Sequence, residues 1–179
     1  MALACVAAHA VELLVRQPPE NLLWSCNVAS LLAALGLLTG TATVNAAGGL
    51  LLLAGEPVWL VDLASGGSLE ATSLLTHLGV AALALVGMRR LGVPRRAWPA
   101  AVVALAVATI AAALTSSAAQ NVNLAVVTPP GWEWFPSHGV YLLWLGGTIC
   151  AGMLGLMLAI RRWLPGAKLT SPASPAGTR

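Results

Sequence analysis

Residues 97–115 read AWPAAVVALAVATIAAALT, without a charged side chain among them. Two arginines, Arg95 and Arg96, stand directly before this stretch. A helix needs about 20 mostly apolar residues to cross a lipid bilayer, and a charge at the bilayer centre costs at least about 2.5 kcal/mol. The stretch therefore has the length and composition of a helix that crosses a membrane.

Three other parts of the chain repeat this pattern, at residues 22–38, 69–88 and 139–160. Over all 179 residues, 58% are hydrophobic and 8% are charged, and the mean hydropathy is +0.84. A soluble core of this size cannot bury so much apolar surface. The sequence predicts an all-α, polytopic membrane helix bundle, and this composition argues against a soluble domain.

The turn signals divide the chain into about six transmembrane helices within a single bundle, residues 1–164. Prolines and glycines mark the helix ends. The predicted helices are residues 2–16, 21–38, 42–53, a fourth from Gly66-Gly67 to Arg90, 98–116 and 137–163. The third is expected to break at Gly55-Glu56-Pro57, which leaves residues 58–63 as a re-entrant or interfacial piece. Residues 165–179 are Pro, Ser, Ala, Gly and Thr-rich, a composition that predicts a disordered tail.

The charges predict how this bundle lies in the membrane. Basic residues collect after the fourth and sixth predicted helices, at Arg89, Arg90, Arg95, Arg96, Arg161, Arg162, Lys168 and Arg179. The opposite loops hold mainly acidic residues, namely Glu20, Glu56, Asp62, Glu70 and Glu133, with Arg16 as their basic residue. The positive-inside rule places the basic loops and both termini in the cytoplasm. Five crossings remain an alternative if the first helix is too short.

The cysteines and the composition narrow the class of site. Cys5, Cys26 and Cys150 are odd in number and lack metal-ligand spacing, so the sequence predicts neither a disulfide framework nor a metal site. No cofactor and no nucleic-acid partner is expected, because the basic residues flank membrane helices instead of forming a stripe. The expected partners are membrane lipids, with a homo-oligomer or a larger membrane complex as further possibilities.

Hydrogen-bonding side chains gather in the predicted outer half of the bundle. At about 1.5 Å rise per residue, Cys26 and Asn27 lie roughly 6–9 Å below the outer end of their helix. His77 falls about two turns into the fourth helix, and the remaining candidates lie near the outer ends, at Asp62, Asn121, Asn123 and His138. Ionisable groups inside a membrane are candidate functional residues. The sequence thus predicts a polar pocket in the outer leaflet half.

Each candidate also has a structural interpretation. Cys26 can be a small packed residue, and His77 can simply bond a backbone carbonyl or a hydroxyl group. Asn121 and Asn123 are expected to cap the irregular backbone after the fifth helix, since unpaired amides in a membrane must find partners. The glycines of the last helix are expected to pack closely against a neighbouring helix.

The segments Trp24-Ser25-Cys26-Asn27 and Gln120-Asn121-Val122-Asn123 resemble the YwaF-type bacterial integral membrane proteins, which are related to eukaryotic membrane ether-phospholipid acyltransferases. The Glu56-Pro57 hairpin, His77 and the aromatic residues 132–141 follow the order of that family. The resemblance implies a bacterial inner membrane protein. One position departs from the family pattern, because Trp24 stands where the family has a histidine.

This resemblance leads to two hypotheses of function. In the first, the protein is a lipid acyltransferase in which Cys26 attacks an acyl ester and His77 takes the proton. Asn27, Asn121, Asn123, Asp62 and His138 then bind substrate. In the second, it is a non-catalytic integral membrane subunit or a lipid- or small-molecule-binding protein, with the polar residues holding helices together. The loss of the family histidine at Trp24 favours the second hypothesis.

Overall fold

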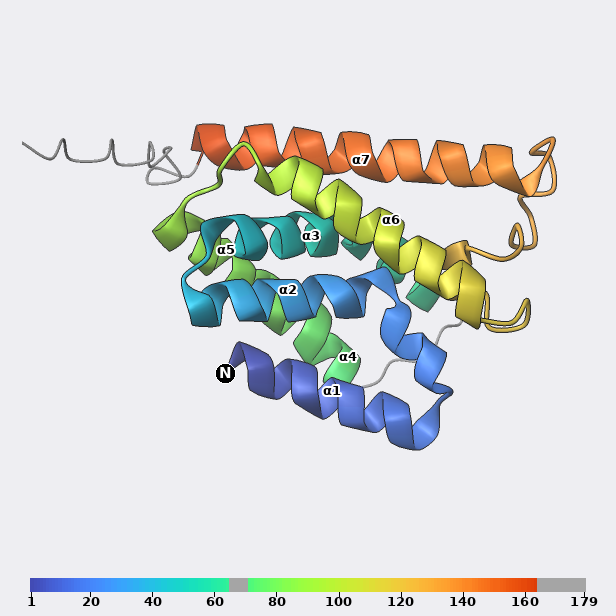
Figure 1. The fold of residues 1–179 in the computed structure, drawn as a ribbon, viewed down its shortest axis with the longest axis horizontal. Coiled ribbons are helices and arrows are strands. Elements are labelled where there is room, and N and C mark those ends of the chain that lie inside the picture. The colour runs from blue at the N-terminus through green and yellow to red at the C-terminus, as the bar shows by residue number, and fades with distance from the viewer. Residues whose placement is uncertain (65–70, 164–179) are drawn as a thin grey trace, which may run out of the picture.

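A computed structural model describes residues 1–64 and 71–163, and every regular element in these ranges is a helix. The long helices lie side by side and alternate in direction (Figure 1). In chain order, the elements are α1 (Ala2–Arg16), the short 3-10 helix η1 (Pro19–Leu23), α2 (Ser25–Thr39), α3 (Ala42–Ala64), α4 (Ala71–Leu74), the π-helix η2 (Leu75–Val80), α5 (Ala81–Leu91), α6 (Ala97–Thr115), the 3-10 turn η3 (Val122–Leu124) and α7 (His138–Trp163). The predicted all-α class is confirmed.

Four helical segments in the described ranges are long and apolar enough to cross a membrane. These are Ala42–Val61, the continuous run Ala71–Leu91 formed by α4, η2 and α5, Ala97–Thr115 and His138–Trp163. The outside of α6 is apolar as well, because Val103, Val107, Ile110 and Leu114 are each 59–80% exposed. Large apolar side chains facing outward at this helical spacing are what a lipid-facing surface requires.

The predicted break in the third helix is wrong. Helix α3 continues through Pro57 to Ala64, so residues 58–63 form no separate piece. Proline inside a helix removes one backbone hydrogen bond, which can kink the helix without ending it. Where no water is present to bond free amides, a continued helix satisfies the following backbone groups better than a loop does.

Two other predictions fall outside the described residues. These are the beginning of the fourth helix at Gly66-Gly67 and the tail at 165–179.

The predicted second helix is shorter than expected, since α2 begins at Ser25 and the 3-10 helix η1 precedes it. Gly40 ends α2 in the left-handed conformation with φ of 67°, which glycine adopts without strain.

Helix α3 occupies the centre of the bundle and contacts α2, α5, α6 and α7. It approaches α2 very closely, because a Cβ added at Gly48 would lie 2.4 Å from the backbone nitrogen of Ala33. A Cβ at Gly36 would lie 2.1 Å from the backbone nitrogen of Asn45, and one at Gly87 would lie 2.4 Å from the Asn45 side-chain oxygen. Glycines therefore let α2 and α3 pack backbone against backbone, and Gly87 leaves room beside α5 for the Asn45 side chain.

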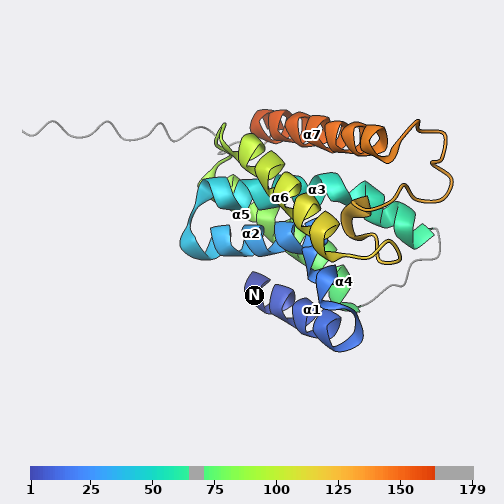
Figure 2. The same cartoon turned by 45° about the vertical axis from the view of Figure 1, so that its right-hand side comes forward.

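The glycines of α7 do not have this role within the chain. An added Cβ at Gly146, Gly147, Gly152 or Gly155 would meet no atom within 4 Å. Figures 1 and 2 show α7 on one side of the bundle and α1 on the other, with α2 and α3 between them. The prediction that these glycines pack closely on a neighbouring helix is thus wrong for the helices of this chain.

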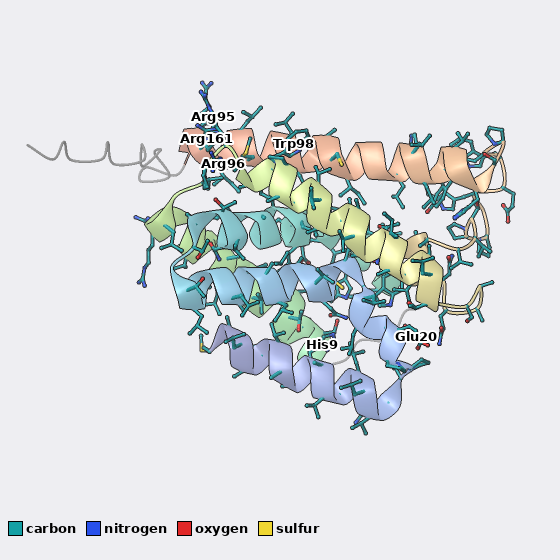
Figure 3. The ribbon with its side chains drawn as sticks, viewed as in Figure 1. His9, Glu20, Arg95, Arg96, Trp98 and Arg161 are labelled. Atoms are coloured by element: carbon teal, nitrogen blue, oxygen red, sulfur yellow. The ribbon has the colours of Figure 1, made fainter. Side chains whose placement is uncertain are left out.

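The charged residues separate along the bundle axis. Arg95, Arg96 and Arg161 lie together at one end, and Glu20 lies toward the opposite end (Figure 3). The two arginine groups come from the α5–α6 connection and from the end of α7, so the alternating helices bring them to the same end. We name these the arginine end and the acidic end.

Candidate functional site

The two segments that carry the family resemblance meet at the acidic end. Asn123 lies in η3 and reaches the start of α2, where its Oδ1 accepts a hydrogen bond from the Ser25 backbone N–H at 2.7 Å. Its Nδ2 donates to the Leu23 carbonyl at 2.7 Å and to the Ala108 carbonyl at 3.3 Å. Asn123 therefore caps α2 from almost 100 residues away, since the two positions are 98 residues apart.

Asn121 shapes the turn that follows α6. Its backbone is left-handed with φ of 41°, a conformation that asparagine tolerates better than most residues. Its Oδ1 accepts the N–H groups of Val126 and Val127, each at 3.0 Å, and its Nδ2 donates to the Val127 carbonyl at 2.8 Å. The prediction of a cap on the irregular backbone after α6 is confirmed for Asn121. Asn123 instead bonds the backbone of residues 23, 25 and 108.

Cys26 and Asn27 lie in the first turn of α2. The Cys26 thiol is 4.0 Å from the Asn27 Oδ1, and the Asn27 Nδ2 donates to the Asn21 carbonyl at 2.9 Å. Cys26 is partly buried and packs against the apolar core. These contacts are those of a packed thiol beside an asparagine that ties α2 to η1.

His77 has a partner that the sequence did not suggest. Its Nδ1 lies 3.3 Å from Oε1 of Glu56 on α3, and its ring stacks on Trp59 with centroids 4.3 Å apart and planes 5° apart. The side chains of His77 and Glu56 are 4% and 18% exposed. We name Glu56, Trp59 and His77 the buried triad.

The expected Cys26–His77 pair is absent from the hydrogen bonds of the described residues, in which His77 pairs with Glu56 and Cys26 with Asn27. No group of three or more His, Cys, Asp or Glu side chains suited to a metal ion occurs there either.

The two remaining candidate residues are His138 and Asp62. His138 begins α7, where its Nε2 lies 3.1 Å from the Ala125 carbonyl and its Nδ1 lies 3.2 Å from the Thr128 hydroxyl. Both ring nitrogens thus tie α7 to the preceding loop. The backbone of Asp62 belongs to α3, and its side chain lies outside the described part of the structure.

A cavity of about 360 Å³ lies where α1, α2 and η2 meet. Its wall is mostly apolar and includes Leu3, Val6 and Leu31. Polar side chains enter this wall from three helices and are His9, Asn27, Ser30 and Thr76. Ser30 is fully buried, and its hydroxyl has no hydrogen-bond partner among the described residues. Among the residues expected to form a polar pocket, Asn27 lines this mostly apolar cavity.

A chain of polar contacts links this cavity to the surface. The Thr72 hydroxyl lies 2.8 Å from His9 Nδ1 and also bonds the Glu12 carboxylate. Glu12 in turn pairs with Arg16 at 3.2 Å, and the Arg16 side chain is 67% exposed. Since His9 lines the cavity, this contact chain runs from the cavity wall to the acidic end.

Several of these residues were not predicted as site residues, namely His9, Ser30, Glu56 and Trp59. The sequence predicts Glu56 in a break before Pro57, and Trp59 in the re-entrant or interfacial piece 58–63. The available signal was their charge and aromatic character inside a stretch apolar enough to span a membrane. Asn45 was missed too; it is fully buried in α3 and donates to the Ala33 carbonyl at 3.1 Å.

Comparisons with known proteins add no relative to this description. The chain matches no family model, no curated protein and no solved structure.

Proposed function

We propose that the chain is a multi-pass membrane protein that crosses the bilayer six times, with its arginine end in the cytoplasm. Four segments have the required length and apolarity, and the positive-inside rule orients them. Helices α1 and α2 have 15 residues each, and at 1.5 Å per residue such helices span about 23 Å. A bilayer accommodates a short helix by local thinning at modest cost. The resemblance to YwaF-type proteins supports a bacterial inner membrane location.

Within this frame, we propose that the protein binds a single-chain amphiphile, a fatty acid or a monoacyl lipid, in the cavity between α1, α2 and η2. The observation that carries this proposal is a cavity of about 360 Å³ with an apolar wall and a fully buried Ser30 hydroxyl that has no hydrogen-bond partner within residues 1–64 and 71–163. Ligand pockets in proteins span about 300–1,000 Å³ and combine an apolar lining with a few polar groups.

The polar groups in the wall suggest how such a ligand is held. A buried hydroxyl without a partner costs about 1–3 kcal/mol, which a hydrogen bond from a ligand head group can recover. Ser30 supplies such a hydroxyl from α2. Asn27 and Thr76 add polar groups from α2 and η2, which also donate to the Asn21 and Thr72 carbonyls. Apolar side chains of α1 face the rest of the space. An alkyl chain with one polar head matches this distribution.

Photo-crosslinking tests this proposal on the full chain in phospholipid nanodiscs. A diazirine-bearing palmitic acid should label peptides of α1 and α2 more than those of α6 and α7. The variant Ala10→Leu adds bulk to the cavity wall and should lower this labelling several-fold. Ala106→Leu makes the same change on an exposed position of α6 and serves as the matched control.

Uniform labelling of all lipid-facing helices, unchanged by Ala10→Leu, would contradict cavity binding. Circular dichroism of both variants shows whether the helices are intact. The comparison is sharp because both substitutions are Ala→Leu on a helix and differ in whether they face the cavity.

Acyl transfer is the second candidate, supported by the contact between Cys26 and the cavity-lining Asn27. In this reaction the Cys26 sulfur attacks the ester carbonyl, the alcohol leaves with a proton, and the acyl group stays as a thioester. The Glu56 contact of His77 argues against His77 as the base for this thiol.

The test of acyl transfer uses a probe that reacts with thiols, an alkyl chloroacetamide, because a long-chain acyl-fluorophosphonate does not report on thiols. Selective labelling of Cys26, lost in Cys26→Ala and retained in Cys150→Ala, would support acyl transfer. No labelling of Cys26 above that of Cys5 and Cys150 would favour the binding function alone.

A further inference from the structure

The buried triad places a carboxylate and an imidazole inside two segments that are long and apolar enough to span a membrane. Glu56 belongs to the segment Ala42–Val61, and His77 belongs to the segment Ala71–Leu91. Ionisable side chains at such positions are rare, and they commonly mark ion or proton pathways. The proposed amphiphile site does not use them, because neither residue lines that cavity.

Both helices are irregular where they carry the triad. Pro57 directly follows Glu56 and removes one backbone hydrogen bond of α3. His77 lies inside the π-helix η2, a rare form that is frequent at functional sites. Two irregularities on two different helices therefore coincide with the one carboxylate–imidazole contact between them.

The contact between Glu56 and His77 requires a proton. At 3.3 Å the Nδ1 and Oε1 atoms are close enough to share a hydrogen bond, and one of them must carry the hydrogen. With an ionised Glu56 and a neutral His77, the pair has a net charge of −1. With one more proton the pair has no net charge, which is the less costly state in an apolar surrounding.

Trp59 supports the protonated state of this pair. Its ring lies parallel to the imidazole at 4.3 Å, and the face of an indole attracts a cation within about 6 Å. A protonated His77 therefore has a carboxylate at its edge and an indole at its face.

Other titratable groups near the triad are few. From α2, Cys26 interacts electrostatically with Glu56. Helix α1, which packs on η2, carries His9 and Glu12, and these are joined to Thr72 of α4. Helix α7 also packs on α3. It carries His138, Tyr141 and Cys150, and its last turn carries Arg161 and Arg162. Helix α5 packs on α3 as well and carries Arg89 and Arg90 in its last turn. Helix α6, the remaining neighbour of α3, has no ionisable side chain.

We propose that Glu56 and His77 form an intramembrane proton-binding site, in which the pair takes up and releases one proton while Trp59 packs on the imidazole. The site is distinct from the amphiphile cavity, since Thr76 of η2 lines the cavity whereas His77 contacts α3.

The emission of Trp59 reports on this proton, because a protonated imidazole stacked on an indole quenches its fluorescence. We would titrate the purified full chain in nanodiscs between about pH 4 and pH 9. This range includes the ordinary pKa values of glutamate and histidine side chains. The difference between wild type and Trp59→Phe isolates Trp59. We expect this difference to fall at least twofold and reversibly as the pH is lowered.

Variants of the pair sharpen the test. His77→Gln should abolish the titration of the Trp59 signal. Glu56→Gln should change the titration of the Trp59 signal, because the imidazolium loses its carboxylate partner. His138→Gln serves as the control and should leave the titration unchanged, since His138 bonds Ala125 and Thr128 instead.

A direct measurement on the wild-type chain covers the case in which these variants fail to fold. Histidine labelled with ¹⁵N shows by NMR whether each ring is neutral or protonated. Comparison with His9→Gln and His138→Gln assigns the His77 signals by elimination. Ring nitrogens of His77 that stay unchanged over the whole pH range, like a Trp59 signal that does not titrate, would overturn the proposal.

Discussion

At the scale of single residues, asparagine side chains connect parts of the chain that are distant in sequence. Asn123 joins η3 to both the end of η1 and the start of α2, and it uses its carbonyl oxygen and its amide nitrogen to do so. Leu23 and Trp24 pack against Val122 at the same junction. Residues 24–27 and 120–123 therefore form one structural unit.

Asn123→Ala should lower the free energy of unfolding by about 1–3 kcal/mol, because α2 loses its cap and two carbonyls lose a donor. Chemical unfolding in detergent micelles measures this change. The matched control is Gln120→Ala, whose side chain bonds only Ser117 in an exposed turn. We expect the control to change stability by less than about 0.5 kcal/mol. Equal stability of Asn123→Ala and Gln120→Ala would contradict a stabilising role of Asn123 at this junction.

Glu133 provides a pH-dependent prediction outside the spanning segments. Its carboxylate accepts backbone N–H bonds from Glu133 and Gly131, and these lower its pKa below the ordinary value of 4.5. Because the pKa is lower in the folded loop, the ionised Glu133 carboxylate stabilises the loop at pH values above its ordinary pKa of 4.5. This contribution is lost as the pH falls through the pKa of the folded loop. An NMR titration should show a lower pKa in the protein than in a peptide of residues 129–135. The same pKa in both would contradict these bonds.

At the scale of elements, most helices could be predicted from apolar length and from their end signals. Helices α1, α6 and α7 lie close to their predicted bounds, because charges, prolines and glycines mark where each apolar run ends. The break at Glu56-Pro57 was wrong because a proline reads as a helix end in water. In an apolar surrounding, the residues after it have no other way to satisfy their backbone.

The candidate site was less predictable than the helices. Rise per residue gave the depth of Cys26 and His77, but the partner of His77 depends on how α3 and η2 turn toward each other. Irregular geometry in η2 and an uninterrupted α3 bring Glu56 to His77 instead. Tertiary packing sets the rotation of each helix about its axis, and a single sequence carries little information about that packing.

Close packing between α2 and α3 makes a prediction at this scale. Gly48→Ala should destabilise the bundle by about 1–3 kcal/mol, because its Cβ would meet the backbone of α2. The distances are 2.4 Å to the Ala33 nitrogen and 2.5 Å to the Ala29 oxygen. Thermal unfolding in detergent measures the effect.

Gly55→Ala is the matched control on the same helix, since nothing lies within 4 Å of an added Cβ there. Replacing glycine by alanine in an open helical position stabilises by roughly 0.4–1 kcal/mol. A Gly48→Ala variant as stable as Gly55→Ala would show that α2 and α3 are not in such close contact.

At the scale of the whole molecule, the separation of charge gives the bundle a direction. The arginines after α5 and at the end of α7 meet at one end although they are far apart in sequence. Helix α3, which carries Glu56 and Trp59, runs between this end and the acidic end (Figure 1). The place of these two residues in the bilayer follows from how the bundle is oriented.

The most direct test of this account is labelling of single cysteines with a membrane-impermeant maleimide in intact bacterial cells. The background carries alanine at Cys5, Cys26 and Cys150, and the reporters are Ala2→Cys, Glu20→Cys, Arg95→Cys and Glu133→Cys. Six crossings with a cytoplasmic arginine end predict that Glu20→Cys and Glu133→Cys are labelled, whereas Ala2→Cys and Arg95→Cys are labelled only after the cells are broken. Labelling of Arg95→Cys in intact cells would contradict the orientation, and labelling of Ala2→Cys there would contradict the sixth crossing.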